Sequence, residues 1–435
     1  MRYSFIETHS RFMQRYFKRG PVCALRFIGL CLLCSSLVLL SSSMASASVI
    51  GRVFKPYGNY TFTADDNMLR IRDRVDPEPL LGTRNLSDIS HRLTGGMMFE
   101  KQISRQRLTA NANFTHTRFE RFSQMNNDLK SFNGNWNWYL GNRLEGNMGA
   151  SYVQSLAPFL FQPGLKNIRT EQTAFFNGAW RFHPSWRLTA DYLRYDLSTG
   201  SDSASNVFRF LNRTEDRFEG GIDYITAHRN TVGIDFRYAI GDFPVRVLGP
   251  DGFARDNSYD QKEVMSRVVW AVTGKSNFTW RGGWVERTNA SFSERNFSGF
   301  NARLAYQWQP TEKIGLTVNG WRETGALQAL TASYSLNTGV SVIPSWNISR
   351  KVRLEGDFSY ETRDFNNFVL LTDSALPLGI NNTIRNATMR LTYVPYRGLQ
   401  LTATAYHMDL KTDQALGGFN ANGATLGVQY TYGRQ

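Results

Sequence analysis

The residues best suited to chemistry in this 435-residue chain are arginines and carboxylates that recur at alternate positions. Arg217, Glu219 and Asp223 follow this spacing, and Asp235 and Arg237 repeat it. Planar guanidinium groups can bind carboxylates, sulfate or sugar hydroxyls, whereas neighbouring opposite charges can also form cross-strand ion pairs that stiffen a wall. Both roles stay open at this point. The candidate set comprises Arg181, Arg187, Arg217, Arg237, Arg267, Arg303, Arg353, Arg390, Asp235 and Asp357.

Residue patterns for catalysis or metal binding are sparse by comparison. Hydrolysis at a side chain needs a nucleophile, a base and an orienting group in one place. His91 lies next to Ser90, but adjacent strand residues face opposite sides, so the pair cannot share a proton. Asp65, Asp66 and Asn67 could bind calcium through oxygen atoms, although such a cluster is more typical of a turn. We therefore expect no enzyme activity, no metal and no cofactor.

The elements that must position the arginines show strict alternation of apolar and polar residues. Within 231–240, Val232 and Ile234 fall on one side, whereas Asp235 and Arg237 fall on the other. Side chains alternate between the two faces of a strand, so this pattern indicates one apolar and one polar face. Segments of about ten residues with this pattern have the length of a strand that crosses a bilayer in a barrel.

The connections between these segments alternate between short turns and longer polar stretches. Short turns are expected at 140–143, 183–185, 274–277, 309–313 and 395–398, and longer loops at 63–87, 154–168, 198–212, 241–258, 366–383 and 410–422. Outer-membrane barrels have short periplasmic turns and longer external loops, whereas a soluble β-sandwich has no reason to separate them. We predict an all-β, antiparallel, up-and-down transmembrane barrel of about 18 strands (16–18), with both termini in the periplasm.

The strand spans that follow from this pattern are listed here for comparison with the structure. They are 53–62, 88–99, 107–119, 129–139, 144–153, 169–182, 186–197, 213–226, 230–240, 259–274, 276–286, 297–309, 313–323, 329–343, 352–365, 384–394, 399–409 and 423–432.

Aromatic residues make up 14% of the chain and gather at the ends of the predicted strands. Aromatic rings with a polar edge are favoured at membrane interfaces, so two girdles are expected. The girdle beside the short turns includes Trp136, Trp138, Trp180, Trp186, Trp308 and Trp346. The girdle at the opposite ends includes Phe119, Trp284, Trp321, Tyr360 and Phe365.

The first 47 residues have the layout of a secretory signal peptide. Six basic residues precede or begin an apolar run at 27–40, and Ala45-Ser46-Ala47 provides a small-residue cleavage site. The domain organisation is therefore a removed signal peptide, 1–47, and one barrel domain, 48–435. The formal charge of +14 includes the leader, whose six basic residues and one acidic residue leave about +9 for the exported chain. Export to the outer membrane implies outer-membrane lipid and the barrel-assembly machinery as partners, and excludes nucleic acid.

The segment Asp65-Asp66-Asn67-Met68-Leu69-Arg70, which follows an aromatic strand beginning at Lys55, resembles the start of a known group. That group is the EpsL-like family of outer-membrane proteins encoded with exosortase-linked exopolysaccharide clusters. The resemblance implies a role in exopolysaccharide biosynthesis or export, with polysaccharide and periplasmic export components as partners. It carries over no catalytic residues. The same barrel and basic lumen also fit a general or substrate-specific diffusion porin, and a third hypothesis is adhesion through the loops at 241–258 and 366–383.

Overall fold

The protein is described by a computed structural model that covers residues 51–160, 164–200, 209, 211–248, 253–291, 293, 296–326, 334–365, 380–413 and 416–433. The predicted signal peptide, 1–47, and most of the predicted loops at 198–212 and 366–383 lie outside these residues. Within them, no helix combines the length and the apolar character needed to cross a membrane.

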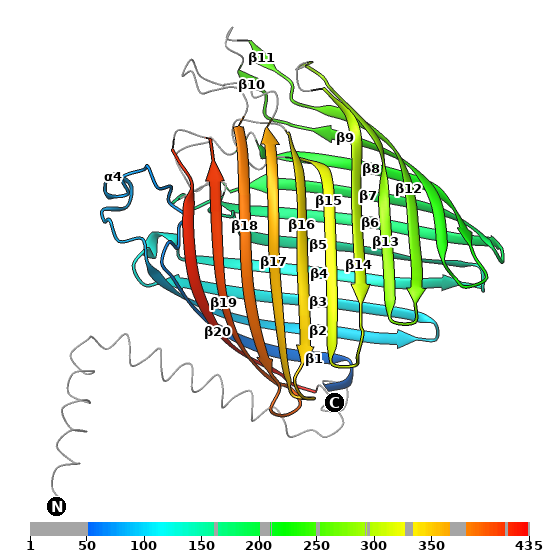
Figure 1. Cartoon of the computed structure of the whole chain (residues 1–435), viewed down its shortest axis with the longest axis horizontal. Helices are drawn as coiled ribbons and strands as arrows, with labels where there is room; N and C mark the ends of the chain where they lie inside the picture. The colour runs from blue at the N-terminus through cyan, green and yellow to red at the C-terminus, as the bar shows by residue number, and fades with distance from the viewer. Residues whose placement is uncertain are drawn as a thin grey trace, which may run out of the picture. The chain divides into compact units, whose positions relative to one another are not determined.

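Eighteen antiparallel strands form one sheet, as the alternation of the sequence predicts (Figure 1). In chain order they are β1 (Phe54–Asp65), β2 (Asp88–Ile103), β3 (Gln106–Phe119), β4 (Asn127–Leu140), β5 (Leu144–Leu156), β6 (Ile168–His183), β7 (Trp186–Thr199), β8 (Arg213–Ile225), β9 (Thr231–Asp242), β12 (Tyr259–Thr273), β13 (Ser276–Asn289), β14 (Phe297–Trp308), β15 (Ile314–Ala326), β16 (Tyr334–Asn347), β17 (Val352–Phe365), β18 (Ile380–Tyr393), β19 (Leu399–Thr412) and β20 (Phe419–Thr431).

Each predicted strand overlaps one observed strand, and the largest displacement is at β16. We expected this strand at 329–343, but it spans Tyr334–Asn347 and continues past Pro344. Pro344 lacks an N–H donor, and the pairing with β17 is interrupted between the pairs Val342–Phe358 and Ser345–Glu355. The strand resumes beyond the proline because Trp346 still pairs with Ile314 on β15.

The sheet closes into a barrel because β1 pairs with both β2 and the last strand, β20. The closing register runs from the pair Tyr57–Thr431 to the pair Asp65–Gly423. With an even number of strands, β1 begins and β20 ends at the same end of the barrel, where the short turns lie. We call this the turn end and the opposite end the loop end.

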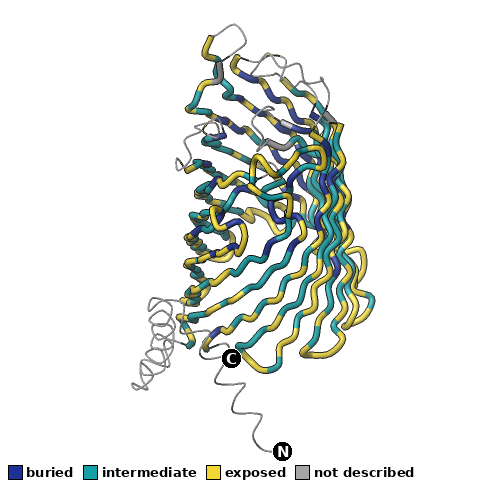
Figure 2. The backbone as a smooth tube through the Cα atoms, turned by 90° about the vertical axis from the view of Figure 1, so that its left-hand side faces the viewer, coloured by how far each residue is buried: buried dark blue, intermediate teal, exposed yellow. Residues whose placement is uncertain are grey.

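The outer face of the barrel is apolar, and large hydrophobic residues there are exposed. Phe236, Trp284 and Val264 have relative exposures of 64%, 57% and 49%. Figure 2 shows the alternation of exposed and less exposed positions along the strands. Exposed apolar side chains on one face and polar side chains on the other are the arrangement of a strand between lipid and water. The protein is therefore a β-barrel of the bacterial outer membrane.

The turn-end girdle is present, but three members of the second predicted girdle are not on the outer face. Trp180 and Trp346 are 48% exposed, and Trp308 is 43% exposed, as a lipid interface requires. Phe119 and Phe365 are each 6% exposed, and Trp321 lies on the same face as Arg303, with which it pairs. These three side chains point inward because each occupies a lumen-facing position in the alternation of its strand.

The loop end carries the remaining secondary structure. The β1–β2 loop contains the short helix α4 (Glu78–Leu81), and the β3–β4 loop contains the 3₁₀ turn η1 (Ser123–Met125). The β9–β12 loop contains the small hairpin β10 (Val247–Leu248) and β11 (Ala254–Arg255). The long loops at this end and the short turns at the other follow the predicted rhythm.

Candidate functional site

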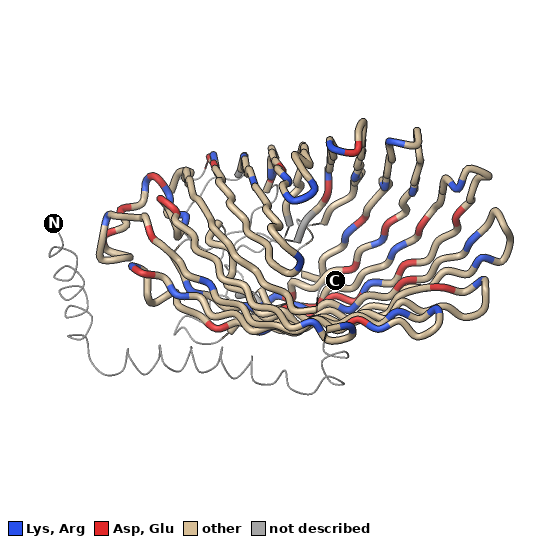
Figure 3. Tube along the Cα trace, turned by 90° about the horizontal axis from the view of Figure 1, so that it is seen from below, with Lys and Arg blue, Asp and Glu red and all other residues tan. Residues whose placement is uncertain are grey.

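A wall of paired charges lines the lumen on β7, β8, β9, β12 and β13. Arg187 and Arg267 each contact the carboxylate of Asp223 at 2.6 Å. Arg267 also lies 3.3 Å from Asp235, which is 3.7 Å from Arg281. Glu219 continues the series, since it lies 2.7 Å from Arg281 and 2.8 Å from Arg237. Arg237 in turn lies 2.9 Å from Glu263. Alternating blue and red segments along neighbouring strands in the right half of Figure 3 show this pattern.

This ion-pair wall contains four arginines and four carboxylates, so its formal charges cancel. Asp223 and Asp235 have no exposed surface, whereas the arginines keep part of their side chains in the lumen. Carboxylates taken out of water need such partners, because an unpaired buried charge is costly. The wall therefore acts first as a rigid structural element.

Two glycines make room for the buried carboxylates. Gly233 pairs with Asp223 on β8 and with Arg267 on β12, and a Cβ atom at Gly233 would lie 2.1 Å from Asp223 Oδ1. A Cβ atom at Gly221 would lie 2.2 Å from Asp235 Oδ1. Asp223 thus lies over a glycine of β9 and reaches across that strand to Arg267 on β12, whereas Asp235 lies over a glycine of β8 and contacts Arg267 on its own neighbouring strand.

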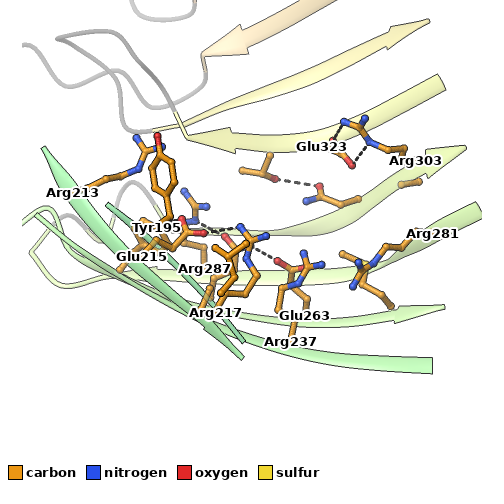
Figure 4. Close-up of a pocket in the computed structure, with 18 of the residues that line it drawn as sticks. Tyr195, Arg213, Glu215, Arg217, Arg237, Glu263, Arg281, Arg287, Arg303 and Glu323 are labelled. Carbon is orange, nitrogen blue, oxygen red and sulfur yellow. Dashed lines mark hydrogen bonds and ion pairs between the residues drawn. The ribbon is translucent and has the colours of Figure 1, made fainter. Parts of the chain in front are cut away.

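Nearer the loop end, the same strands enclose an arginine-lined pocket of about 610 Å³ (Figure 4). Its lining residues come from β6, β7, β8, β9 and β12 to β15. Six arginines and three glutamates line it, so their formal charges sum to +3. They are Arg213, Arg217, Arg237, Arg281, Arg287, Arg303, Glu215, Glu263 and Glu323.

Two tyrosines hold arginines against the pocket wall. The Arg287 guanidinium lies 4.0 Å from the ring centroid of Tyr259, and that of Arg213 lies 5.4 Å from the ring centroid of Tyr195. The Tyr259 hydroxyl donates to Glu215. When a guanidinium stacks on an aromatic ring, its flat face contacts the ring. Its N–H groups, which lie in the guanidinium plane, can still donate hydrogen bonds to a ligand.

Several guanidinium donors in this pocket lack a hydrogen-bond acceptor in the described part of the chain. These donors include the buried Nε atoms of Arg213, Arg217 and Arg281. A buried donor without an acceptor is unfavourable, so each favours an incoming oxygen atom. The pocket can therefore bind carboxylate, phosphate or sulfate oxygens.

The opposite sector of the lumen is mainly uncharged, apart from Arg92 and the ion-paired group of Lys55, Glu100 and Arg107. Inward positions there carry amides and hydroxyls, including Asn59, Thr61, Thr63, Thr94, Asn111, Asn113, Thr115, Asn133, Asn135, Asn137, Asn147, Asn177, Thr402, Thr404, Thr425 and Gln429. Asn135 donates to Asn137 at 3.2 Å, Asn137 donates to Asn147, and Asn147 donates to Asn177 at 3.2 Å. We call this surface the amide wall.

Loops cover part of the mouth at the loop end. Leu69, Ile71, Phe119 and Phe122 form an apolar cluster contributed by the β1–β2 loop and the β3–β4 region. Leu160, from the β5–β6 loop, packs against a second cluster on the inner face of β18 to β20 that includes Phe419. These loops lie on the side of the amide wall.

The family-like segment forms the anchor of this cap. Both carboxylate oxygens of Asp65 accept bonds from Arg70, at 2.9 and 2.8 Å, and Asn67 bonds to the backbone of Ile71 at both its amide atoms. Burial alone would lower the pKa of Arg70, but the bonds to Asp65 hold that pKa above its ordinary value. Because Arg70 occupies the oxygens that calcium would need, the segment is a turn, and no group of three metal-binding side chains occurs among the described residues.

The predicted site residues fall into three groups. Arg187, Arg237, Arg267 and Asp235 join the ion-pair wall, and Arg217 and Arg303 line the pocket. Arg353, Arg390 and Asp357 occupy inward positions on β17 and β18 away from the pocket, and Arg181 lies in the irregular stretch of β6 between Trp180 and His183. Arg353 pairs with Glu355 at 2.5 Å.

Sequence reasoning missed eight of the charged and aromatic pocket residues, namely Tyr195, Arg213, Glu215, Tyr259, Glu263, Arg281, Arg287 and Glu323. The alternation that identified Arg217 and Arg237 also places these residues on the inner face. The signal was therefore available for their orientation. Their convergence into one pocket depends on the register of eight strands, which cannot be predicted from the spacing of residues within one strand.

Comparison with known proteins gives a likeness to several solved barrels. Pseudomonas aeruginosa OccK2 (OpdF) is 8% identical with a TM-score of 0.47, and the match covers 87% of this chain and 98% of that chain. Acinetobacter baumannii OccAB3 is 11% identical with a TM-score of 0.45, and the match covers 88% of this chain and 99% of that chain. A BenF-like porin from Pseudomonas fluorescens Pf-5 is 8% identical with a TM-score of 0.45, and the match covers 87% of this chain and 98% of that chain. No protein-family model and no curated protein sequence matches the chain.

Proposed function

We propose that this barrel is a substrate-selective diffusion channel of the outer membrane, in which the arginine-lined pocket selects small anionic solutes. The observation that carries the proposal is the charge of +3 on the pocket lining, together with buried guanidinium donors that have no acceptor in the described chain. Arginine edges bind carboxylate and phosphate oxygens through paired N–H groups. The ion-pair wall shares Arg237, Arg281 and Glu263 with the pocket, and its other five residues sum to a formal charge of −1, so we expect anion selectivity to come from the pocket.

The orientation proposed for the channel follows from the lengths of its connections. Barrels of this kind have longer loops outside the cell and short turns in the periplasm. We therefore place the loop end outside and both ends of the chain in the periplasm. Solutes would meet the arginine-lined pocket near the outer mouth, before they pass the ion-pair wall.

The test is the reversal potential of the purified channel in a planar bilayer under a KCl gradient. We expect preference for chloride over potassium, and current reduction by added succinate. The double variant Arg213→Gln, Arg217→Gln should lose most of the anion preference and the succinate effect. Arg353→Gln changes a lumen charge away from the pocket and serves as the matched control. Equal losses in both variants, or no anion preference in the parent protein, would refute the assignment.

Exopolysaccharide biosynthesis or export is the second candidate. Two observations favour it: the resemblance of the segment from Asp65 to Arg70 to the EpsL-like family, and the amide wall, which offers donors and acceptors to a polymer without charge. Deleting the gene from its host should then abolish surface polymer and leave small-solute uptake unchanged. Normal surface polymer in the deletion strain would exclude this role, whereas slower uptake of small anions would support the channel.

A further inference from the structure

The wall of the barrel is split between β14 and β15 at the loop end. The pairing of these strands ends at Ala302 and Arg322, although β14 begins at Phe297 and β15 continues to Ala326. Each strand stays paired on its other side, β14 with β13 through Phe297 and β15 with β16 through Ala326. The split therefore leaves four to five residues of each strand, about 15 Å of wall, without a ladder between them.

Exposed aromatic side chains lie on the outer face at the level of this split. Phe300, within the unpaired part of β14, is 43% exposed, and Trp284, its partner on β13, is 57% exposed. Exposed aromatic rings are typical of the interface between lipid and water in a barrel. Backbone groups without partners are costly beside lipid, so a split at this level calls for a functional explanation.

Side chains, rather than a backbone ladder, connect the two edges of the split. Arg322 donates to the backbone oxygen of Phe300, and the Thr324 hydroxyl donates to Asn301 Oδ1 at 3.2 Å. Single hydrogen bonds of this kind contribute little to stability, so the edges can separate while the rest of the barrel stays paired. Because Arg322 occupies the Phe300 oxygen, the edge is a poor template for the addition of a peptide strand.

The arginine-lined pocket reaches the split from the lumen side. Its lining includes Asn301 and Arg303 on β14 and Glu323 and Thr324 on β15. Arg303 contacts Glu323 at 2.6 Å between the two strands (Figure 4). A molecule held by the guanidinium groups of the pocket can therefore extend between β14 and β15 toward the lipid.

A shorter split between β4 and β5 differs in what lies behind it. Pairing there ends at Ser131 and Val153, short of the strand ends at Asn127 and Leu156. Leu156 packs against the apolar cluster of the cap, which contains Phe122. The cap thus covers the lumen side of that split, whereas a charged pocket lies behind the split between β14 and β15.

We propose that the split between β14 and β15 is a lateral portal through which the pocket binds anionic amphiphiles, molecules with a charged head and a hydrocarbon tail. The lining charge of +3 favours an anionic head, which the guanidinium groups bind. The tail passes between the two strands to the exposed rings of Phe300 and Trp284. Each methylene that leaves water adds to binding, so affinity rises with tail length. This inference rests on the proposed anion pocket and deepens it by naming the substrate class.

The first experiment measures the block of the ion current of the full-length exported protein in a planar bilayer by carboxylates of increasing tail length. We expect the half-blocking concentration to fall at least about tenfold from butyrate to decanoate. The double variant Arg213→Gln, Arg217→Gln should weaken the block by decanoate and by succinate alike, because both need the pocket. A decanoate effect that persists in this variant would show that decanoate acts on the lipid, and would overturn the proposal.

A label beside the split tests the route of the tail. All three natural cysteines lie within 1–47, the predicted signal peptide, so Ser298→Cys gives the exported chain a single thiol in the unpaired part of β14. Modification with fluorescein maleimide before reconstitution should raise the half-blocking decanoate concentration about tenfold and leave the block by succinate as it was before modification. Val340→Cys, on the outer face of β16 with 43% exposure, is the matched control, and its modification should change neither value.

The outcomes separate the portal from the pocket. Equal half-blocking concentrations for butyrate and decanoate in a channel that succinate blocks would overturn the portal and leave the anion pocket intact. Equal effects of the label at Ser298→Cys and Val340→Cys would do the same. A parent channel that succinate does not block would instead refute the pocket, and the portal with it. Folding of each variant is checked by the heat-dependent gel shift of the barrel, and the tail-length series on the parent protein decides the matter if Ser298→Cys does not fold.

Discussion

Arg267 donates to Asp223 Oδ1 across 2.6 Å although a complete strand, β9, separates the two residues. The contact is possible because the intervening position is Gly233, over which the carboxylate lies. The pairing of charges in this wall thus depends on a residue that carries no charge. The neighbouring carboxylate, Asp235, lies over Gly221 in the same manner.

Gly233→Ala should therefore weaken the barrel as if a charged residue had been removed. The new Cβ atom would displace the Asp223 carboxylate and leave Arg187 and Arg267 without their closest partner. We expect a loss of about 2–3 kcal/mol in unfolding free energy, below the cost of breaking a fully buried pair because lumen water reaches both arginines. Urea unfolding in detergent micelles measures it.

The control for this prediction is Gly220→Ala on the outer face, where the nearest atom would be 4.0 Å from the new Cβ. It should change stability by no more than about 0.5 kcal/mol. Asp223→Asn should match Gly233→Ala, and the double variant should cost little more than either single change, because both break the same contacts. Additive costs would show that Gly233 acts independently of the carboxylate.

Glu323→Gln should increase the anion preference of the channel. Glu323 accepts two bonds from Arg303, at 3.0 and 2.6 Å, at the exposed side of the pocket. Removing its charge raises the formal charge of the pocket lining from +3 to +4. The reversal potential under a KCl gradient should move further toward that of chloride, whereas stability should change by less than about 1 kcal/mol because the pair is exposed. A shift toward potassium would contradict the pocket assignment.

Arg70→Lys should loosen the cap at the loop end and leave the barrel intact. Lysine cannot reproduce the two-point contact that Arg70 makes with Asp65. We expect faster proteolytic cleavage within 66–87 and an unchanged heat-dependent gel shift. Arg84→Lys is the control, because Arg84 forms exposed pairs with Asp76 and Glu78 in the same loop. Equal cleavage rates in both variants would show that the Asp65–Arg70 contact does not anchor the cap.

Phe236→Arg should reveal the position of the lipid. Phe236 lies on the outer face with 64% exposure, in the apolar part of β9. An arginine within the hydrocarbon region of a barrel costs about 2–4 kcal/mol, whereas the cost near the interface is about 0–1 kcal/mol. Thr288→Arg, on the outer face near the loop end of β13, should show the lower cost. Refolding into lipid vesicles at increasing urea concentrations measures both.

The fold followed closely from sequence because each strand carries its own signal. A strand between lipid and water must alternate, and this constraint acts residue by residue, so even β9 could be assigned without its neighbours. The alternation gives the face of a residue, whereas its aromatic character alone does not. Phe119, Trp321 and Phe365 were assigned to the outer girdle by their rings, although the alternation places them on the inner face.

The sites were harder to predict because they depend on which strands are adjacent and in what register. Arg217 and Arg281 are 64 positions apart, and their convergence on one pocket follows from the pairing of β8 with β9, β9 with β12 and β12 with β13. Glycines such as Gly221 and Gly233 carry no chemical group that would draw attention to them. Their importance appears only when the carboxylate from the adjacent strand is seen above them.

The first and last strands meet beside the segment that anchors the cap. Asp66 accepts bonds from the backbone and side-chain amides of Asn422 at 2.7 and 2.8 Å, and Tyr406 donates to Asp65. These partners lie more than 340 positions along the chain from the residues they hold. The cap therefore cannot reach its final conformation while the chain is still incomplete, which makes it one of the last parts of the molecule to be ordered. The cap therefore becomes ordered only after β1 and β20 have paired and the barrel has closed.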